Sequence, residues 1–250
     1  MIELTGNFRI QRLFCDIDKD VKISDIFRSV YMAGVVEEDI SPMIPFFYNV
    51  EYGYTAIHDL SKPMDEIFSN MKSTVRNEIR RAEKEGFQVQ NGLWYDELIE
   101  YYNRFAKSKG LNDRLSRERL TRYPEIFISK AIDNGNILAM HATIVDRQSQ
   151  QSMLLFSCSQ RFDDGIDKAK IGWANSYLHY KDFIYLQSIG ILTYDWAGIA
   201  YNPENPQHSI GQFKMKFGGK LTRTIVLTTP LFRLLYKIKS VVYRMRNYIG

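Results

Sequence analysis

Two apolar stretches near the middle of the chain break with the helical spacing that precedes them. They cover 136–146 (NILAMHATIVD) and 151–160 (QSMLLFSCSQ), and the four polar residues RQSQ separate them. Two strand-like stretches joined by so short a polar connection are typical of an antiparallel hairpin. Since helices are expected before this hairpin and a helix and strands after it, the sequence predicts a mixed α/β (α+β) fold.

The elements around the hairpin follow from the spacing of apolar residues. Spacing at i, i+3 and i+4 predicts helices, and alternation of apolar and polar residues predicts strands. Helices are expected at 22–36, 64–86, 94–110, 116–132 with a kink at Pro124, and 173–190. Further strands are expected at 8–17, 51–61, 87–90, 191–196 and 221–228.

The composition of the 250 residues is that of a globular protein with a packed core. Hydrophobic residues make up 45% of the chain, and no apolar run approaches the roughly 18 residues that a membrane span requires. The N-terminal residues lack the basic and apolar regions of a secretory signal, so we expect a cytoplasmic location. Cys15 and Cys158 lie far apart and outside any CxxC spacing, which predicts neither a disulfide nor a metal site.

The net charge of +4 is concentrated at the C-terminus. Residues 230–250 contain five basic side chains and no acid, which leaves 28 bases against 29 acids in the rest of the chain. A neutral body argues against a broad nucleic-acid surface. The tail also has an apolar stripe at helical spacing. It therefore predicts an amphipathic helix that packs on the protein or a partner subunit, or lies on an anionic membrane surface.

Three segments together resemble the FemAB-like branch of the GNAT acyltransferase superfamily. The first, 55–89, joins a strand to DLS and to a basic helix that ends in IRRAEKEG, and the second, 135–159, contains the hairpin. The third consists of YDWAGI (194–199) and FKMKFGG (213–219). These look like the aspartate-glycine strand end and the Phe-Lys-x-x-Phe-Gly loop of that group. The resemblance spans two thirds of the chain.

The resemblance implies a GNAT-like fold, in which a mixed central sheet with splayed strands is flanked by helices and followed by the amphipathic tail. It implies a transferase domain at 55–229, a strand-helix remnant at 1–54 packed on this domain, and the tail at 230–250. Members of this branch transfer acyl or aminoacyl groups to amines of cell-envelope precursors. The expected acceptor is an amino sugar or peptide of a nucleotide-linked or lipid-linked precursor for the cell envelope or a surface polysaccharide.

Two donors fit this resemblance. Acyl-CoA is favoured over aminoacyl-tRNA, because a single half-module with a neutral body offers little surface for a large polyanion. Nucleic acid is expected as a partner only if tRNA is the donor. The candidate cofactor-binding residues lie at the end of the hairpin and in the loop after it: Ser157, Ser159, Arg161 and Gly165.

Acyl transfer to an amine needs a base and a group that stabilises the oxyanion. The resemblance places Asp195 at a strand end that faces the donor, where it is a candidate base; the alternative is an aspartate that only forms a turn. Lys214 is the stronger candidate, as a cation for the oxyanion or a phosphate; the alternative is a solvated loop lysine. Extended alternation in FKMKF puts Phe213 on one face and Lys214 and Lys216 on the other, and either face can line the cleft.

Tyr194 and His141 complete the candidate catalytic set. Tyr194 is a candidate proton donor to a thiolate leaving group, and the alternative is a packed aromatic residue. His141 is a candidate base near neutral pH, and the alternative is a structural strand histidine. Cys158 is expected to be inert, since no partner that would activate it is identifiable.

Candidate substrate-binding residues come from two regions. Four basic residues recur every four positions from Lys72 to Lys84, and Arg76 and Arg80 among them are candidates for binding phosphate; the alternative is a solvated face paired with neighbouring glutamates. The other candidates flank the catalytic positions: Trp196, Phe213 and Lys216.

Two rival functions remain beside the acyltransferase. One is a non-catalytic GNAT-like module that binds a glycan precursor or joins a biosynthetic complex through its tail. The other is an aminoacyl-tRNA-dependent peptidyltransferase. The enzyme hypothesis predicts that Asp195 and Lys214 converge on an opening between the splayed strands, and the basic tail suits peripheral contact with the cytoplasmic face of the inner membrane.

Overall fold

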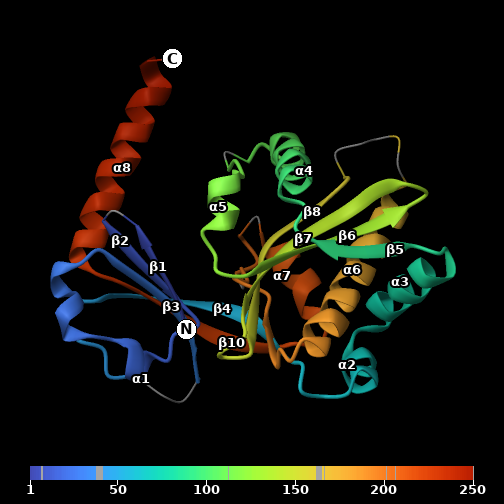
Figure 1. The fold of residues 1–250 in the computed structure, drawn as a ribbon, viewed down its shortest axis with the longest axis horizontal. Helices are drawn as coiled ribbons and strands as arrows, with labels where there is room; N and C mark the ends of the chain where they lie inside the picture. Colours follow the sequence, from blue (N-terminus) through green and yellow to red (C-terminus); the bar gives the residue numbers. More distant parts are fainter. Residues whose placement is uncertain are drawn as a thin grey trace. The chain divides into compact units, whose positions relative to one another are not determined.

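The chain folds into two units in the computed structural model (Figure 1). Unit 1 consists of Met1–Thr55 and Thr222–Gly250, and unit 2 consists of Ala56–Leu221. The structure describes residues 1–6, 8–37, 42–111, 113–161, 165, 167–200, 202–205 and 207–249, with side chains as far as 242.

Unit 1 is built on a small sheet. Its strands are β1 (Ile2–Gly6), β2 (Arg9–Leu13), β3 (Val30–Val36), the first part of β4 (Asn49–Asp59) and most of β10 (Lys220–Thr228). β1 and β2 pair antiparallel, β2 and β3 parallel, and β3 and β10 antiparallel. The helix α1 (Ile17–Asp20) and the 3-10 helix η1 (Ile23–Phe27) connect β2 to β3.

The core of unit 1 encloses an ion pair. Arg12 Nη1 lies 2.6 Å from Asp25 Oδ2, and these side chains are 2% and 0% exposed. The Tyr48 hydroxyl donates to the same carboxylate over 2.9 Å. Because a buried charge is tolerated only when it is paired and hydrogen-bonded, these contacts hold η1 against β2.

The C-terminal helix α8 (Pro230–Ile249) confirms the predicted helical tail. Leu234, Ile238 and Val241 are about half exposed on it. The expected basic residues Arg244 and Arg246 lie beyond the described side chains. Among the described residues, no helix is both long enough and apolar enough to cross a membrane.

Unit 2 contains a sheet in the order β4-β9-β8-β7-β6-β5. Besides β4, its strands are β5 (Gln88–Gly92), β6 (Ile126–Asp133), β7 (Asn136–Asp146), β8 (Gln151–Ser159) and β9 (Thr193–Asp195). The predicted hairpin is confirmed as β7 and β8. Every neighbouring pair in this order is antiparallel except β8 and β9, which are parallel. The mixed sheet confirms the predicted fold class.

Helices cover both faces of the unit 2 sheet (Figure 1). They are α2 (Met64–Asn70), α3 (Ser73–Lys84), α4 (Tyr95–Ser108), α5 (Arg117–Thr121), α6 (Lys168–Ser188) and α7 (His208–Met215). We call the side covered by α6 and α3 the α6 face, and the side covered by α4 and α5 the α4 face. α3 packs through Val75, Ile79 and Ala82, whose spacing puts them on one side of the helix.

The parallel strands β8 and β9 part soon after they meet. They pair from Gln151 opposite Thr193 to Met153 opposite Asp195, whereas β8 continues to Ser159. A bulge lies at the parting point, because Leu155 falls between two pairings of β8 with β7 and has no opposite residue there. A bulge bends its strand and increases the local twist. This geometry agrees with the splayed strands that the family resemblance implied.

The helix expected at 116–132 is wrong in its second half. α5 ends at Thr121, and Ile126–Asp133 form β6. Six consecutive residues of β6, 126–131, are buried because the strand lies between two others with helices on both faces. Periodicity does not distinguish such a continuous apolar run from a buried helix.

Two other expected helices differ from the structure. Most of the helix expected at 22–36 is wrong, because η1 ends at Phe27 and β3 follows it. The helix expected at 64–86 is divided into α2 and α3 by extended backbone at Met71 and Lys72. Arg76 Nη1 donates to the carbonyl of Met71 over 2.6 Å. This bond satisfies a carbonyl at the C-terminal end of α2, which a continuous helix would have paired with a backbone N–H four residues on.

Candidate active site

The α6 face carries a cluster of buried polar side chains around His141 of β7. Asn175, His179 and Asp182 of α6 are four and three residues apart and therefore lie on one side of the helix. His141 Nδ1 lies 2.7 Å from Asp182 Oδ2, and His141 Nε2 lies 3.1 Å from Asn175 Oδ1. Both nitrogens of the His141 ring are thus engaged, and the ring is fixed between β7 and α6.

The same cluster has the composition of a metal site. One ligand atom each from His141, His179 and Asp182 lies within 4.8 Å of the others. The two imidazole rings, however, are stacked with centroids 3.9 Å apart and an interplanar angle of 28°. Lone pairs in the planes of stacked rings run side by side and do not converge on one point. We therefore interpret these residues as a polar cluster that does not fit a metal ion.

Several buried polar atoms of this face have no hydrogen-bond partner among the residues that the structure describes. They include His179 Nδ1, Asp182 Oδ1 and Trp196 Nε1. An unpaired buried polar group costs about 1–3 kcal/mol. Their concentration on one face is typical of a place where a substrate or ordered water completes the bonding.

Burial determines the protonation of the two titratable groups at the centre of this face. Burial lowers the pKa of His179 well below 6.5, and the nearby His141 and Lys214 lower it further. Burial raises the pKa of Tyr194 well above 10, and the carboxylate of Asp182 raises it further. At neutral pH, His179 is therefore uncharged and Tyr194 keeps its proton.

Lys214 of α7 reaches the turn that follows β9. Its Nζ donates to the carbonyls of Trp196 over 2.7 Å, Ala197 over 3.1 Å and Gly198 over 3.0 Å. Burial lowers the pKa of this ammonium from 10.5 to about 8, although the carboxylate of Asp195 opposes the shift. Lys214 is therefore held by three carbonyls and has a lowered pKa. It is not the solvated loop lysine of the alternative interpretation.

Asp195 supports the same turn from the other side. Its Oδ1 accepts a hydrogen bond of 2.8 Å from the backbone N–H of Ala197, whose φ is +55°. A carboxylate that bonds the amide two residues on is the geometry of a turn-forming aspartate. Asp195 and Lys214 thus meet at residues 196–198, and a role of Asp195 as base stays a prediction.

The extended alternation expected for FKMKF is wrong, because Phe213 to Met215 end the helix α7. Phe213 and Phe217 face the core, with ring centroids 5.9 Å and 5.3 Å from His179. Trp196, expected beside the acceptor, is fully buried and packs on His179 with centroids 4.4 Å apart. Successive helical residues are about 100° apart, so the two lysines do not share a face. Lys214 is directed to the turn after β9, and Lys216 lies at the edge of a surface pocket.

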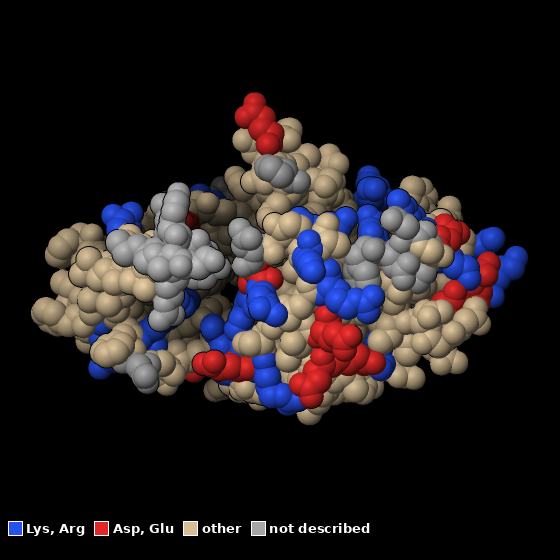
Figure 2. Space-filling view, turned by 90° about the horizontal axis from the view of Figure 1, so that it is seen from above, with Lys and Arg blue, Asp and Glu red and all other residues tan. Residues whose placement is uncertain are grey.

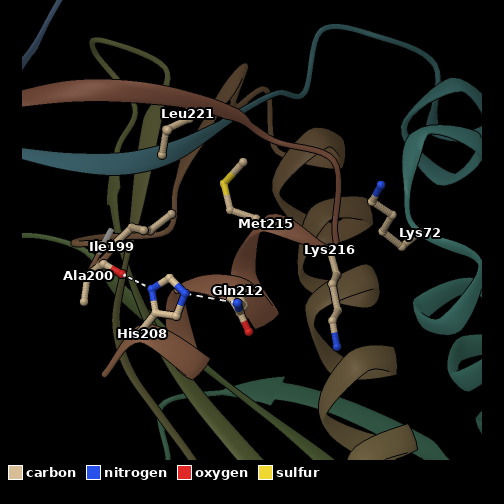
Figure 3. Close-up of a pocket in the computed structure, with 9 residues that line it drawn as sticks. Lys72, Ile199, Ala200, His208, Gln212, Met215, Lys216 and Leu221 are labelled. Atoms are coloured by element: carbon tan, nitrogen blue, oxygen red, sulfur yellow. Dashed lines mark hydrogen bonds between the residues drawn. The ribbon is translucent and has the colours of Figure 1, made fainter. Parts of the chain in front are cut away.

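This pocket lies in unit 2 between α7, the loop after β9 and the junction of α2 and α3 (Figure 3). Its volume is about 260 Å³. Ile199, Met215 and Leu221 give it apolar walls, and Lys72 and Lys216 lie along one side. The sequence pattern included Lys72 in the basic stripe, but gave no signal that Lys216 would join it.

The phosphate-binding candidates of α3 are engaged in other contacts. Arg76 donates to the carbonyls of Ser69 and Met71 at the end of α2. The Arg80 guanidinium lies over the Phe68 ring, 5.3 Å from its centroid. Figure 2 shows Lys and Arg in several separate groups with an acidic group among them, so the face in view is no continuous basic surface.

The candidate cofactor-binding residues fall into two groups. Ser157 lies opposite His141 in the pairing of β7 and β8, and Ser159 lies opposite Ala139. Directly opposite residues share a face, so both serines belong to the α6 face where β8 leaves β9. Arg161 and Gly165 are exposed, and most of the loop between them lies outside the described residues.

The start of α6 follows that loop, which carries the cofactor-binding candidates Arg161 and Gly165. Asp167 caps this helix, and its carboxylate accepts a 2.8 Å hydrogen bond from the backbone N–H of Ala169. The Asp167 carboxylate thus occupies a backbone N–H that a bound anion would otherwise accept from. Its negative charge also repels an anion at this end of the helix.

Residues of α6 were missed by the sequence interpretation. Asn175, His179 and Asp182 belong to a helix that is buried on several sides. Its sequence therefore has no single apolar stripe against which polar residues at i, i+4 and i+7 would stand out, and only their spacing was a signal.

Comparison with known proteins gives matches at the level of structure. No family model matches the sequence, and no curated protein matches it. The fold is similar to the crystal structure of FemX, with a TM-score of 0.64 and 12% identity over 84% of this chain and 74% of that chain. It is also similar to L-PGS from Bacillus licheniformis, with a TM-score of 0.56 and 12% identity over 91% and 79% of the two chains.

A third similar structure is a C-terminal domain assigned to a lysylphosphatidylglycerol synthetase of Agrobacterium fabrum, with a TM-score of 0.57, 9% identity, and 90% and 79% of the two chains covered. At these identities the likeness concerns the fold. It confirms the FemAB-like GNAT fold that the three sequence segments indicated.

Proposed function

We propose that the chain transfers an acyl or aminoacyl group from an activated donor to an amine of a cell-envelope or surface-polysaccharide precursor. The acceptor amine belongs to an amino sugar or peptide that is carried by a nucleotide or a lipid. The observation that carries this proposal is the parting of β8 from β9 beside Lys214 and the buried polar cluster, in a fold shared with FemX.

The reaction joins the amine nitrogen to the acyl carbon. The bond from that carbon to the thiol sulfur or ribose oxygen of the donor breaks, and the proton that nitrogen loses goes to a base and then to the leaving group. Lys214 turns one N–H from the carbonyls of the 196–198 turn to the developing oxyanion. Asp195 takes the amine proton, and His141 is the alternative base once its Nε2 is released from Asn175 Oδ1. Tyr194 gives its proton to the leaving group and regains one from the base, so that one proton in all passes from the amine to the leaving group.

The donor is either acyl-CoA or aminoacyl-tRNA. The serines Ser157 and Ser159, at the parting of the strands, contact the donor near its acyl group. The negative charge of the cap Asp167 at the start of α6 disfavours a pyrophosphate there, and therefore favours an aminoacyl donor over acyl-CoA. We place the reaction in the cytoplasm, with α8 in peripheral contact with the membrane through its exposed apolar residues and its bases.

The test is mass spectrometry of the purified chain, incubated with a panel of acyl-CoA and charged tRNA donors and with amino-sugar nucleotides and peptide precursors. The expected result is an acceptor whose mass has grown by the acyl group, formed only in the presence of the protein. No product across the panel would contradict the proposed transfer.

A second function is favoured by one observation. The three hydrogens of the Lys214 ammonium have three carbonyl partners, which is the pattern of a lysine that braces a loop in a non-catalytic binding module. Calorimetry would then show that the chain binds a precursor, and mass spectrometry that it does not convert it. A folded Lys214→Met variant would bind the precursor with the affinity of the wild type.

A further inference from the structure

The pocket beside α7 lies next to the lysine that acts in the proposed transfer. Gly211 lines the pocket, and Lys214 follows three residues later, so the two are neighbours on the surface of the helix, about 4.5 Å apart along its axis. The loop after β9 follows the same helix. Lys214 Nζ donates to the carbonyl of Gly198 over 3.0 Å, and Ile199, the next residue of the loop, lines the pocket. Two shared elements therefore hold the pocket and this ammonium side by side.

α7 is fixed against this loop at Gly211. A Cβ on this residue would lie 2.9 Å from the Ile199 side chain and 3.2 Å from the carbonyl oxygen of Ala200. Three residues earlier on the helix, His208 Nδ1 lies 3.1 Å from the same carbonyl. A close approach that only glycine permits and a hydrogen bond thus give the pocket its shape, and most small-molecule sites are preformed in this way.

The walls inside the pocket are apolar. The side chains of Ile199, Met215 and Leu221 come from the loop after β9, from α7 and from β10, and they surround a common space (Figure 3). None of the lining residues in the described part of the chain is acidic. An apolar group gains free energy when it leaves water for such a surface, whereas a charged group loses its hydration there. The pocket therefore selects an uncharged, apolar group.

The polar groups around this space are used by the protein or lie outside it. His208 Nδ1 is paired with the Ala200 carbonyl, and His208 Nε2 lies 3.0 Å from Gln212 Nε2 (Figure 3). Protein atoms thus occupy both nitrogens of the ring. Lys72 and Lys216 lie at the edge of the pocket, apart from its apolar side chains (Figure 3).

The volume of the pocket limits what it holds. A dry apolar cavity of about 150 Å³ accommodates benzene, and sites for whole drug-sized molecules have roughly 300–1,000 Å³. At about 260 Å³ this pocket lies between the two. It therefore fits one side chain of the size of leucine or phenylalanine, and not a nucleotide or a long lipid chain.

We propose that this pocket receives an apolar side chain of the acyl group that is transferred. The inference rests on the proposed function, because it takes the acyl oxygen to lie at Lys214, one residue of the loop away from Ile199. The substituent on the acyl carbon then enters the space between Ile199, Met215 and Leu221. Two donors share this chemistry: an aminoacyl-tRNA whose amino acid is apolar, such as leucine, and a branched acyl-CoA, such as isovaleryl-CoA.

Binding at the pocket is tested without any transfer. The full chain is labelled with ¹³C at the methyl groups of its nine methionines, and Met215→Leu identifies the NMR signal of Met215. Titration with N-acetylleucine amide is expected to shift this signal, because the leucine side chain packs on the Met215 methyl group. N-acetylglycine amide lacks that side chain and should leave the signal in place at the same concentrations. No shift with the leucine compound, or an equal shift with the glycine compound, would overturn the site.

Transfer rates show whether the pocket acts on the donor. The chain is given leucyl-tRNA or glycyl-tRNA, and isovaleryl-CoA or acetyl-CoA, with the acceptors of the mass spectrometry assay. In the pair that is used, kcat/KM is expected to be at least tenfold higher for the branched donor, since a methylene in an apolar pocket is worth roughly 10–200-fold. Product from none of the four donors would contradict the proposed function, and with it the role of the pocket in transfer. Equal kcat/KM within the pair would leave the proposed function intact and overturn this inference.

Variants connect the preference with the pocket. Leu221→Phe fills the space and is expected to lower kcat/KM at least tenfold for the branched donor, while the value for the small donor stays within threefold. Met215→Gln is expected to lower kcat/KM several-fold for the branched donor alone. Ile210→Gln, at an exposed residue of α7 outside the lining of the pocket, is the matched control and should change neither value.

Two results with these variants would refute the pocket as the site of the side chain. One is an equal loss for both donors in Leu221→Phe, and the other is a loss of the preference in Ile210→Gln. Thermal melts show that each variant is folded.

Discussion

The two faces of the unit 2 sheet differ in how their buried polar groups are satisfied. On the α4 face, the Tyr101 hydroxyl donates to the carbonyl of Ile137 and the Tyr102 hydroxyl to Asp113, both over 3.1 Å. On the α6 face, His179 Nδ1 and the indole N–H of Trp196 have no partner among the described residues. Both faces belong to one sheet and have helices packed on them.

This difference indicates where stability and where function reside. A face that only supports the fold needs buried side chains that are apolar or whose polar groups are hydrogen-bonded, as the two tyrosines of the α4 face are. Unpaired buried groups cost stability, and native proteins concentrate such costs at functional sites. We therefore expect changes on the α4 face to affect unfolding alone, and changes on the α6 face to affect the proposed transfer as well.

The largest effect on stability is expected from Leu98→Ala on the α4 face. Leu98 of α4 is fully buried, and a Leu→Ala change at such a site lowers the free energy of unfolding by about 2–5 kcal/mol. Chemical denaturation measures this loss. At a temperature where the variant is folded, its transfer rate per folded molecule should equal that of the wild type, and a large loss of rate would remove the distinction between the faces.

Asp182→Ala is expected to have a smaller effect on stability and a clear effect on transfer. The change removes the acceptor of His141 Nδ1, and a buried donor left without a partner costs about 1–3 kcal/mol. Asp182→Asn, which keeps an oxygen at this position, is the matched control and should lose less. Equal unfolding midpoints for all three proteins in urea would show that this hydrogen bond has no role.

The pH dependence of stability distinguishes Lys214 from an ordinary lysine. Its pKa is about 8 in the fold and 10.5 when exposed, so the unfolded chain holds this proton more strongly. The free energy of unfolding should therefore rise between about pH 8 and pH 10.5, and the penalty should be complete below pH 8. Subtracting the curve of Lys214→Met isolates this slope from other groups, and parallel curves for the two proteins would refute the lowered pKa.

The smallest effect is expected from Ser129→Ala on the α6 face. Ser129 is fully buried opposite His141, and its Oγ has no partner among the described residues. Alanine lacks only this hydroxyl, so the free energy of unfolding should stay within about 1 kcal/mol or rise. A loss of about 2 kcal/mol or more in urea denaturation would show that this hydroxyl is paired, and that the α6 face resembles the α4 face.

The sequence predicted the parts of the fold that are locally specified. The hairpin of β7 and β8, the long helix α6 and the tail helix α8 follow from spacing and turn residues. β3 and β6 were misassigned, because each is an apolar run whose strand form depends on neighbours supplied by distant segments: β10 for β3, and β5 and β7 for β6. Local propensity does not contain those neighbours.

For the candidate site, too, the sequence predicted what local motifs specify and missed what depends on distant segments. Lys214 and Asp195 were identified from motifs and do meet at one turn, but the direction of Lys214 depended on α7 being a helix, which alternation in FKMKF concealed. Lys216 and Lys72 could not be linked from the sequence, since 144 positions separate them and a single backbone hydrogen bond joins them.

Transfer by Lys214→Met, compared with Lys84→Met, tests the central claim most directly. A donor and acceptor pair that gives product with the wild type is used, and both variants are first shown to be folded by thermal melts. The account predicts that Lys84→Met retains the wild-type rate and that Lys214→Met loses at least about 100-fold, as expected when a group that stabilises the oxyanion is removed. A rate within threefold of the wild type in folded Lys214→Met would contradict the placement of the reaction on the α6 face beside this lysine.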